Sequence, residues 1–385
     1  MAVPQFTTVA DVLVHTLDFL GANVTPDAQR DCRRSILAAY RDIANAHKWS
    51  YLYQHGRVST VAPQSSSTIT YDHTGGTYER MVTLASGTWP SWAANGSIDI
   101  SNVVYEVADR KSNTELTLSI NSNPGADKAA GTAYTIYRDT YPLPVDFIAS
   151  DLMHPEDNWA GMSYVHPREW LAHIRTYSTG SGTPRMFTIV GDPNFAGGTL
   201  AIRLYPYPDS AKTIDFMYQR RPRQLLIDEY KTGTVSNTAN SATVTGASTV
   251  FKSSMVGSVI RLSANGTDDP TSFIGASPFD YERVVTAFTS ATSITVDRTI
   301  TDAHTNVKYI LSDPIDLEEG AMMTAFLRGC EAQLAITRIM RDRPNSLGLY
   351  QQSLMDAKAA DSRCSQPRAA GQGGYRRRIV DMPLG

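Results

Sequence analysis

Cysteine pairs, long apolar runs and a large net charge are all missing from this sequence. The three cysteines, Cys32, Cys330 and Cys364, are odd in number and widely spaced, so they suit a reducing cytoplasm and predict no disulfide framework. No apolar stretch approaches the roughly 20 residues that cross a bilayer. The N-terminus lacks the basic and apolar regions of a secretory signal. A net charge of −3 argues against binding nucleic acid through overall charge. We therefore expect a protein made in a reducing cytoplasm, with no membrane partner.

Catalytic motifs are missing as well. The eight histidines form no His-Glu-x-x-His helix, and there is neither a nucleophile elbow nor a paired cysteine motif. The loop at 180–184 lacks the lysine and the following helix of a phosphate loop. Asp268 and Asp269 lack the acidic spacing of a calcium loop. We therefore expect no catalytic, cofactor-binding or metal-binding residues, and the chain is predicted not to be an enzyme.

Two β-rich stretches of similar pattern are present instead, from about Gly56 to Tyr141 and from about Lys231 to Asp313. Each has a Gly-Ser followed by alternating apolar residues, then a Ser-x-Thr turn with a strand, then a strand that begins with tyrosine. The matching segments are 96–100 with 257–262, 112–118 with 290–296, and 134–136 with 309–311. Thr88 precedes Gly96 by the same distance that Thr249 precedes Gly257. This similarity predicts one small β module that is used twice.

Both chain ends are predicted to be helical. A stretch from Thr7 to Gly21 is amphipathic, and Thr25-Pro26-Asp27 is typical of a helix start. A second helical pair is predicted to start at Asp313-Pro314 and to be broken at Arg343-Pro344. Two terminal pairs pack most simply as a four-helix bundle. The residues expected in its core or interfaces are Tyr40, Ile43, His47, Trp49, Phe326 and Leu334.

Between the two modules, residues 166–174 predict a short helix. Three strands follow at 185–190, 199–205 and 213–218, and the turns between them predict a meander.

Residues 366–374 are rich in Gly, Ala and Gln and cannot build a core, so we expect an extended arm. The arm ends in a basic and apolar segment: Tyr375, Arg376, Arg377, Arg378, Ile379 and Val380. A second basic cluster, 220–223, is equally consistent with a solvated surface and with contacts to phosphates or acidic protein.

The predicted fold class is α+β, with a helical bundle built from both ends, a central β-meander, two inserted antiparallel β modules and an extended C-terminal arm. The predicted domains are N-terminal bundle helices 1–54, first module 55–141, central helix and meander 142–230, second module 231–313, C-terminal bundle helices 314–364 and arm 365–385.

Three segments resemble those of tailed-bacteriophage head-to-tail adaptor proteins. They are the helix with its aromatic end at 40–52, the segment 141–147, and the segment 204–222 with its Pro-rich turn. The resemblance covers the helical ends and the middle of the chain. The two modules depart from the smallest adaptors, which are little more than a helical bundle.

The resemblance implies a structural virion protein in the neck between capsid and tail, with no catalysis. It implies a homo-oligomeric ring of about twelve copies beneath the portal, a closed assembly that rotational symmetry permits. The C-terminal arm would dock on the portal protein, and tail or nozzle proteins would bind below. Double-stranded DNA would pass through the channel without sequence-specific contacts.

Two alternatives come from the residues themselves. Trp89, Trp92 and Tyr105 could stack on sugar rings if they are exposed, which would fit a glycan-binding or adhesive protein of the phage tail. The plentiful carboxylates could fit an enzyme acting on cell wall or polysaccharide. The missing secretory signal and the long helices argue against the glycan-binding alternative.

Overall fold

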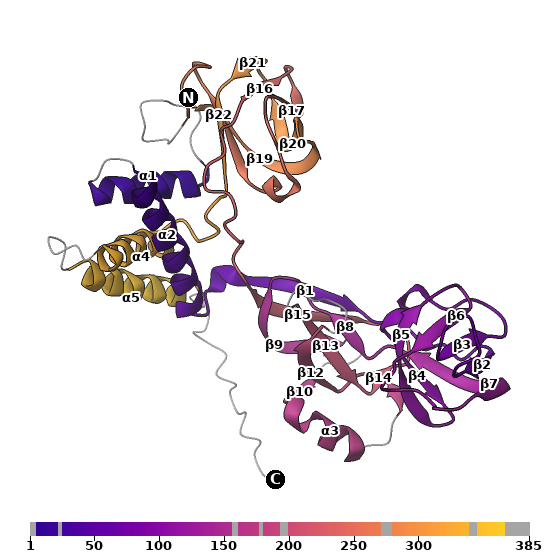
Figure 1. Ribbon diagram of the computed structural model, residues 1–385. Coiled ribbons are helices and arrows are strands. Elements are labelled where there is room, and N and C mark those ends of the chain that lie inside the picture. Colours follow the sequence, from indigo (N-terminus) through magenta and orange to yellow (C-terminus); the bar gives the residue numbers. More distant parts are fainter. Residues whose placement is uncertain are drawn as a thin grey trace, which may run out of the picture. The chain divides into compact units, whose positions relative to one another are not determined.

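The computed structural model describes residues 5–21, 25–155, 161–176, 180–192, 199–270, 279–338 and 345–365. The predicted helix break at 343–344 and the predicted arm lie outside these residues. The chain divides into two compact units (Figure 1). The helix–module unit consists of Met1–Tyr51 and Pro222–Gly385, and the sheet–module unit of Leu52–Arg221.

The helix–module unit contains four long helices: α1 (Val9–Leu20), α2 (Pro26–Ala46), α4 (Ala321–Thr337) and α5 (Ser346–Ser365). Thr8 caps α1 in a capping box with Asp11, and Gly21 ends it in the left-handed conformation at φ 62°. Thr25 caps α2, and Pro26 occupies its first turn. Each N-cap stabilises its helix by about 1 kcal/mol. The starts of α1 and α2 therefore follow from local sequence.

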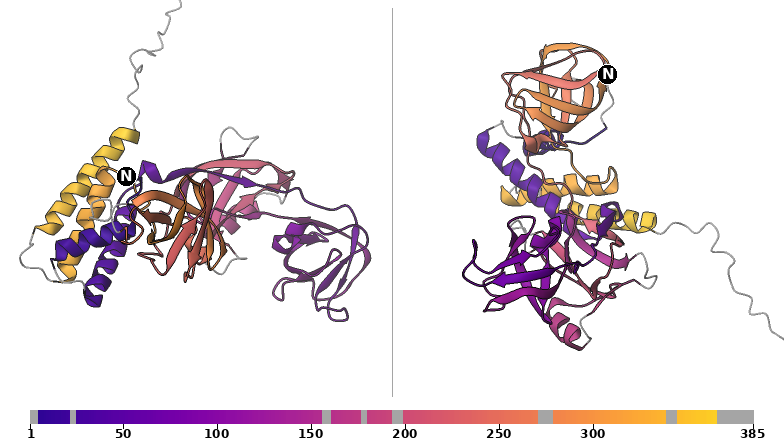
Figure 2. Two further views of the ribbon diagram at one scale, coloured as in Figure 1. Left: turned by 90° about the horizontal axis from the view of Figure 1, so that it is seen from above. Right: turned by 90° about the vertical axis from the view of Figure 1, so that its right-hand side faces the viewer.

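Close packing among α2, α4 and α5 depends on a glycine. Gly329 of α4 is buried, and a Cβ built on it would lie 3.3 Å from Cβ of Ala39 on α2 and 3.1 Å from the ring of Tyr350 on α5. The missing side chain thus lets both neighbouring helices approach α4. The helix α1 contacts both α2 and α4 (Figure 2).

The predicted helix start at Asp313-Pro314 is wrong, because α4 begins at Ala321. Asp313 instead follows the last strand of the second module and is fully buried. Its carboxylate accepts hydrogen bonds from the 222–230 segment and from Ser258, so it is not available to cap a helix. Tertiary contacts therefore override the local Asp-Pro signal.

The second module is a seven-stranded antiparallel sheet in the order β21-β16-β17-β20-β19-β18-β22. Its two end strands, β21 and β22, are consecutive in the chain and are separated only by Lys308. The strands are β16 (Thr234–Asn237), β17 (Ser241–Ala247), β18 (Val259–Ser263), β19 (Phe279–Ser290), β20 (Ser293–Ile300), β21 (His304–Val307) and β22 (Tyr309–Ser312), with the 3-10 turn η3 (Ser253–Met255).

The first module is a closed six-stranded barrel in the order β2-β3-β6-β5-β4-β7. Its strands are β2 (Thr68–Asp72), β3 (Met81–Leu84), β4 (Ser97–Ile100), β5 (Val103–Arg110), β6 (Glu115–Leu118) and β7 (Lys128–Tyr137), with the 3-10 turn η2 (Ser91–Asn95). The predicted module boundary at residue 55 falls inside β1 (Tyr53–Ser59), and that strand pairs with β15 of a separate sheet rather than with the barrel.

The two modules have the same connectivity when β7 is matched with β21 and β22 together. The Ser-x-Thr turns also match, because Ser112 and Ser290 each accept a hydrogen bond at 3.2 Å from the backbone N–H two residues later. The Gly-Ser alignment is one residue out of register, however. Gly96 O accepts from Val107 N, and its structural counterpart is Ser258, whose O accepts from Val285 N. Tight pairing within the sheet, not the position of glycine, sets this register.

The remaining strands of the sheet–module unit form smaller sheets in the orders β1-β15-β9, β10-β12-β13-β8 and β11-β14. Their bounds are β8 (Thr140–Pro142), β9 (Phe147–Pro155), β10 (Ser163–Tyr164), β11 (Ser181–Gly182), β12 (Met186–Gly191), β13 (Leu200–Tyr205), β14 (Tyr207–Pro208) and β15 (Thr213–Arg220). The unit also holds α3 (Pro167–Thr176), and the turn η1 (Ser50–Leu52) precedes β1.

The predicted meander is correct for β12 and β13, which pair antiparallel, but not for its third strand. The strand β15 pairs with β1 and β9 instead of β13. Pro206 and Pro208 lie between β13 and β15, and neither has a backbone N–H to extend the first sheet. The chain therefore leaves one sheet and enters another.

Candidate functional site

Five of the six residues predicted for the bundle core or interfaces are buried in the helix–module unit. Ile43, Phe326 and Leu334 are fully buried, and Trp49 and Tyr40 are nearly so. The Tyr40 and Phe326 rings meet edge to face with centroids 6.0 Å apart. These side chains bring α2 and α4 together and expose little surface to any partner.

His47 is the partly exposed member of the predicted set. Its Nε2 lies 3.1 Å from Oδ2 of Asp361 on α5, and its ring meets Trp49 edge to face at 5.1 Å. Trp49 Nε1 donates to Ile43 O at 2.7 Å, which folds the indole back onto the end of α2. Asp361 also accepts from the backbone N–H of Ser50 at 3.0 Å. His47 therefore ties the end of α2 to α5, as a structural histidine does.

Arg223, from the second basic cluster, has a structural role. Its Nη2 donates to Asp313 Oδ1 at 2.9 Å and to Val256 O at 3.0 Å. Its backbone N–H donates to Asp316 Oδ2 at 2.9 Å. These contacts anchor the start of the segment Pro222–Tyr230, which we call the linker segment.

Asp313 and α2 hold the linker segment along its length. The backbone N–H groups of Leu226 and Ile227 donate to Asp313 Oδ2 at 2.7 and 2.8 Å. At one end Tyr40 Oη donates to Arg223 O at 2.9 Å, and at the other Arg33 forms an ion pair with Asp228. Residues 224–227 are therefore held in place, but they leave Leu37 on the neighbouring face of α2 exposed.

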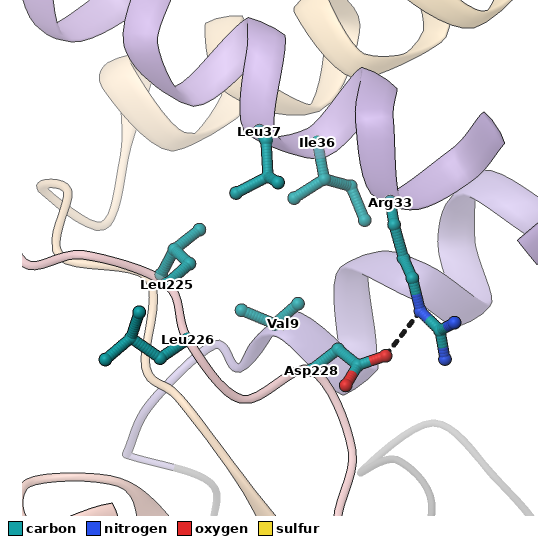
Figure 3. A pocket seen from close by; sticks show the side chains of 7 residues that line it. All are labelled: Val9, Arg33, Ile36, Leu37, Leu225, Leu226 and Asp228. Carbon is teal, nitrogen blue, oxygen red and sulfur yellow. Dashed lines mark ion pairs between the residues drawn. The ribbon is translucent and has the colours of Figure 1, made fainter. Parts of the chain in front are cut away.

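An apolar groove lies between α2 and this stretch (Figure 3). Ile36 and Leu37 of α2 face Leu225 and Leu226 of the linker segment across it, Val9 forms part of its wall, and the Arg33–Asp228 ion pair lies to one side. Its volume is about 290 Å³. Leu226 is 63% exposed and Leu37 38% exposed, although both are large apolar residues. We call this the linker groove.

Sequence reasoning missed a buried ionic cluster that joins α1 to the second module. The Arg261 guanidinium is 1% exposed, and its Nη1 and Nη2 donate to the two carboxylate oxygens of Asp11 at 2.7 and 2.9 Å. Its Nε donates to Glu282 Oε1 at 2.9 Å. Burial acts to lower the pKa of Arg261, but the two carboxylates outweigh it and raise that pKa. The alternating pattern of β18 gave no signal of this cluster, because Arg261 and Asp11 are far apart in sequence.

The residues behind the glycan-binding alternative do not form an exposed aromatic platform. Trp89 is 2% exposed and packs edge to face on Tyr134 inside the first module. Trp92 and Tyr105 are half-buried against the same core. The exposure that the glycan-binding alternative requires is therefore absent at Trp89, because its indole lies in the core of the first module.

Within the described ranges, no group of three or more His, Cys, Asp or Glu side chains is arranged to hold a metal ion. None of the described helices is long and apolar enough to span a membrane.

Residues 90–242 match the model of the SU10 adaptor protein family. This similarity indicates a phage adaptor-like virion component with a structural role. The matched residues begin after β3, include β4 to β7 of the first module, and end at the second residue of β17. The family match therefore covers much of the first module, whereas the resemblance described from the sequence covered only the helical ends and the middle of the chain. No curated protein matches the chain.

Proposed function

We propose that this protein is a head-to-tail adaptor that forms a ring beneath the portal, links the capsid to the tail and lines part of the DNA channel. The match of residues 90–242 to the SU10 adaptor protein family carries the proposal. The resemblance of the aromatic end of α2, residues 40–52, to head-to-tail adaptors supports it. In this segment Trp49 bonds back to Ile43, and His47 contacts both Trp49 and Asp361 of α5. In this proposal the chain is a structural protein without catalytic activity.

The C-terminal arm docks on the portal protein in this proposal. It follows α5 directly in the sequence, and its three consecutive arginines are flanked by the apolar anchors Tyr375 and Ile379. Arginine pairs and buried apolar anchors would offset the entropy lost when such a segment becomes ordered on binding. Tail or nozzle proteins bind the opposite side of the ring, and double-stranded DNA passes without sequence-specific contacts.

The test is a mixture of the full chain with its cognate portal, followed by sedimentation and electron microscopy. We expect a closed ring on the portal, which rotational symmetry permits, with a copy number of about twelve as the resemblance to head-to-tail adaptors implies. Truncation after Gln366 should abolish portal binding while leaving the melting of the remaining chain unchanged. Portal binding that survives the truncation would refute the role of the arm, and no complex with the full chain would refute the adaptor function.

A further inference from the structure

The linker groove is an apolar surface that the chain itself leaves uncovered. Leu226 and Leu37 are exposed across it, whereas Ile36 and Val9 beside them are buried. Exposed apolar side chains that line one hollow are a feature of interaction sites. Its volume of about 290 Å³ suits a protruding apolar side chain better than a drug-sized ligand.

The groove is preformed. Asp313 fixes the backbone of Leu226 and Ile227, and the contacts from Tyr40 and Arg33 hold both ends of the linker segment on α2. The backbone of Leu226 therefore cannot move toward Leu37 without breaking hydrogen bonds to a buried carboxylate. A docking surface that is already ordered loses less conformational entropy when it binds.

The rim of the groove is basic. Arg33 and Arg34 are exposed on α2 one turn before Leu37, and Arg41 follows one turn after it. Arg33 is paired with Asp228, but no described residue pairs with Arg34 or Arg41. The groove therefore favours an apolar anchor that has an acidic neighbour.

The helix α5 of a second copy offers that combination. Met355 is 71% exposed, and the exposed Asp356 follows it directly. The residues one turn away from Met355 on α5 are Gln351, Gln352, Lys358 and Ala359, so Met355 is the large apolar side chain on this part of the helix surface. The opposite face of α5 is already used, because Tyr350 and Ala357 are buried against the chain's own helices.

We propose that the linker groove of one copy receives Met355 of α5 from a neighbouring copy, with Asp356 facing the arginines of α2. The flexible methionine side chain adapts to an irregular groove. The groove and the α5 face are different surfaces, so the contact is head-to-tail and can close into a ring. The inference rests on the proposed ring and specifies which surfaces form it.

Cysteine cross-linking between separate chains tests this contact. Full chains carrying Leu226→Cys and full chains carrying Met355→Cys are mixed under mild oxidation, both in a Cys364→Ser background; Cys32 and Cys330 are buried. We expect a disulfide-linked heterodimer in this mixture, because a disulfide requires closely placed Cα atoms. The control mixture replaces Met355→Cys with Val145→Cys, which is equally accessible at 77% exposure, and should give background linkage. Linkage no higher than in the control would overturn the proposal.

Charge reversal gives a second, independent test. Arg34→Glu should weaken self-association by about tenfold or more through repulsion of Asp356. Combining Arg34→Glu with Asp356→Arg should restore it, and a merely destabilised fold would not be rescued in this way. The groove contact would be rejected if the double variant did not regain self-association. It would also be rejected if rings formed normally but residues 226 and 355 did not cross-link. Either result would leave the adaptor proposal standing. A chain that forms no multimer even with the portal would reject the adaptor proposal itself.

Discussion

The two modules share one strand connectivity but differ in what covers the outer face of a matching strand. In the first module, β4 alternates between buried and half-buried residues, and its outer face carries Ser97 and Asp99. In the second module, all five residues of β18 are buried, and Arg261 occupies the position that matches Asp99. The start of α1 covers that outer face through the Arg261–Asp11 pair.

This difference shows that a repeated module need not have a repeated role. The sequence predicted two similar β modules inserted into a helical protein. The second module instead belongs to the same compact unit as α1, α2, α4 and α5. The first module belongs to the other unit, where Tyr137 stacks on Tyr207 with ring centroids 3.9 Å apart. The core of each module is nonetheless alike, because Phe251 and Tyr309 meet as Trp89 and Tyr134 do.

The largest loss of stability is expected when Arg261, whose charge joins α1 to the second module, is removed. Arg261→Ala leaves Asp11 and Glu282 buried without their partner, which should lower the free energy of unfolding by about 3–5 kcal/mol. Hydrogen exchange should then rise together in α1 and in the second module. The matched control is Asp99→Ala in the first module, which should change stability by less than about 0.5 kcal/mol. Equal effects of the two variants would show that the modules are attached alike.

A smaller loss is expected at Asp313. Asp313→Ala removes the acceptor for Leu226, Ile227, Arg223 and Ser258. The first three of these hydrogen bonds are only partly buried, so water can replace the lost acceptor, and we expect a net loss of about 1.5–3 kcal/mol in the free energy of unfolding. Denaturant unfolding should show this loss, and exchange of the amide protons of Leu226 and Ile227 should become fast. Unchanged exchange at those two amides would mean that Asp313 does not hold the linker segment.

A still smaller effect is expected where the first module meets its own unit. Tyr207→Ala removes the stacking on Tyr137, which should cost about 0.5–1.5 kcal/mol beyond lost burial. The variant should expose Tyr137, whose pKa is raised by burial, and lower that pKa toward the ordinary tyrosine value. A spectroscopic tyrosine titration measures this shift. A titration that matches the parent chain would contradict a role for the stack.

The smallest expected effect is on the stability of the fold at acidic pH. Burial acts to raise the pKa of Glu331, but hydrogen bonds from His15 and Arg328 outweigh it and lower that pKa. A carboxyl whose pKa is lower in the folded state stabilises the fold above its unfolded pKa, and this contribution is lost as the pH falls through the folded value. Glu331→Gln should therefore flatten the acid side of the stability profile by less than about 1 kcal/mol. Thermal melting as a function of pH measures this profile. Equally steep acid sides for the parent and the variant would refute the contribution of Glu331.

Local sequence was sufficient wherever a short-range interaction decides the structure. Thr25-Pro26 starts α2, Thr8 starts α1, and the serines at 112 and 290 form the same turn in both modules. Local signals failed at Asp313-Pro314, because distant backbone groups use that carboxylate. They also failed for β15, since strand pairing depends on which edges are available in space and not on order along the chain.

By itself the sequence determined the helical ends, the repeated β pattern and the resemblance to phage adaptors, because capping, alternation and turn chemistry act over a few residues. Only the tertiary structure decided that the second module is joined to the helices and that the linker groove stays open. Both depend on buried charges that pair across long stretches of chain: Arg261 with Asp11, and Asp313 with the linker segment. A buried charge must find a partner wherever the fold brings one near, and sequence spacing does not reveal which partner that is.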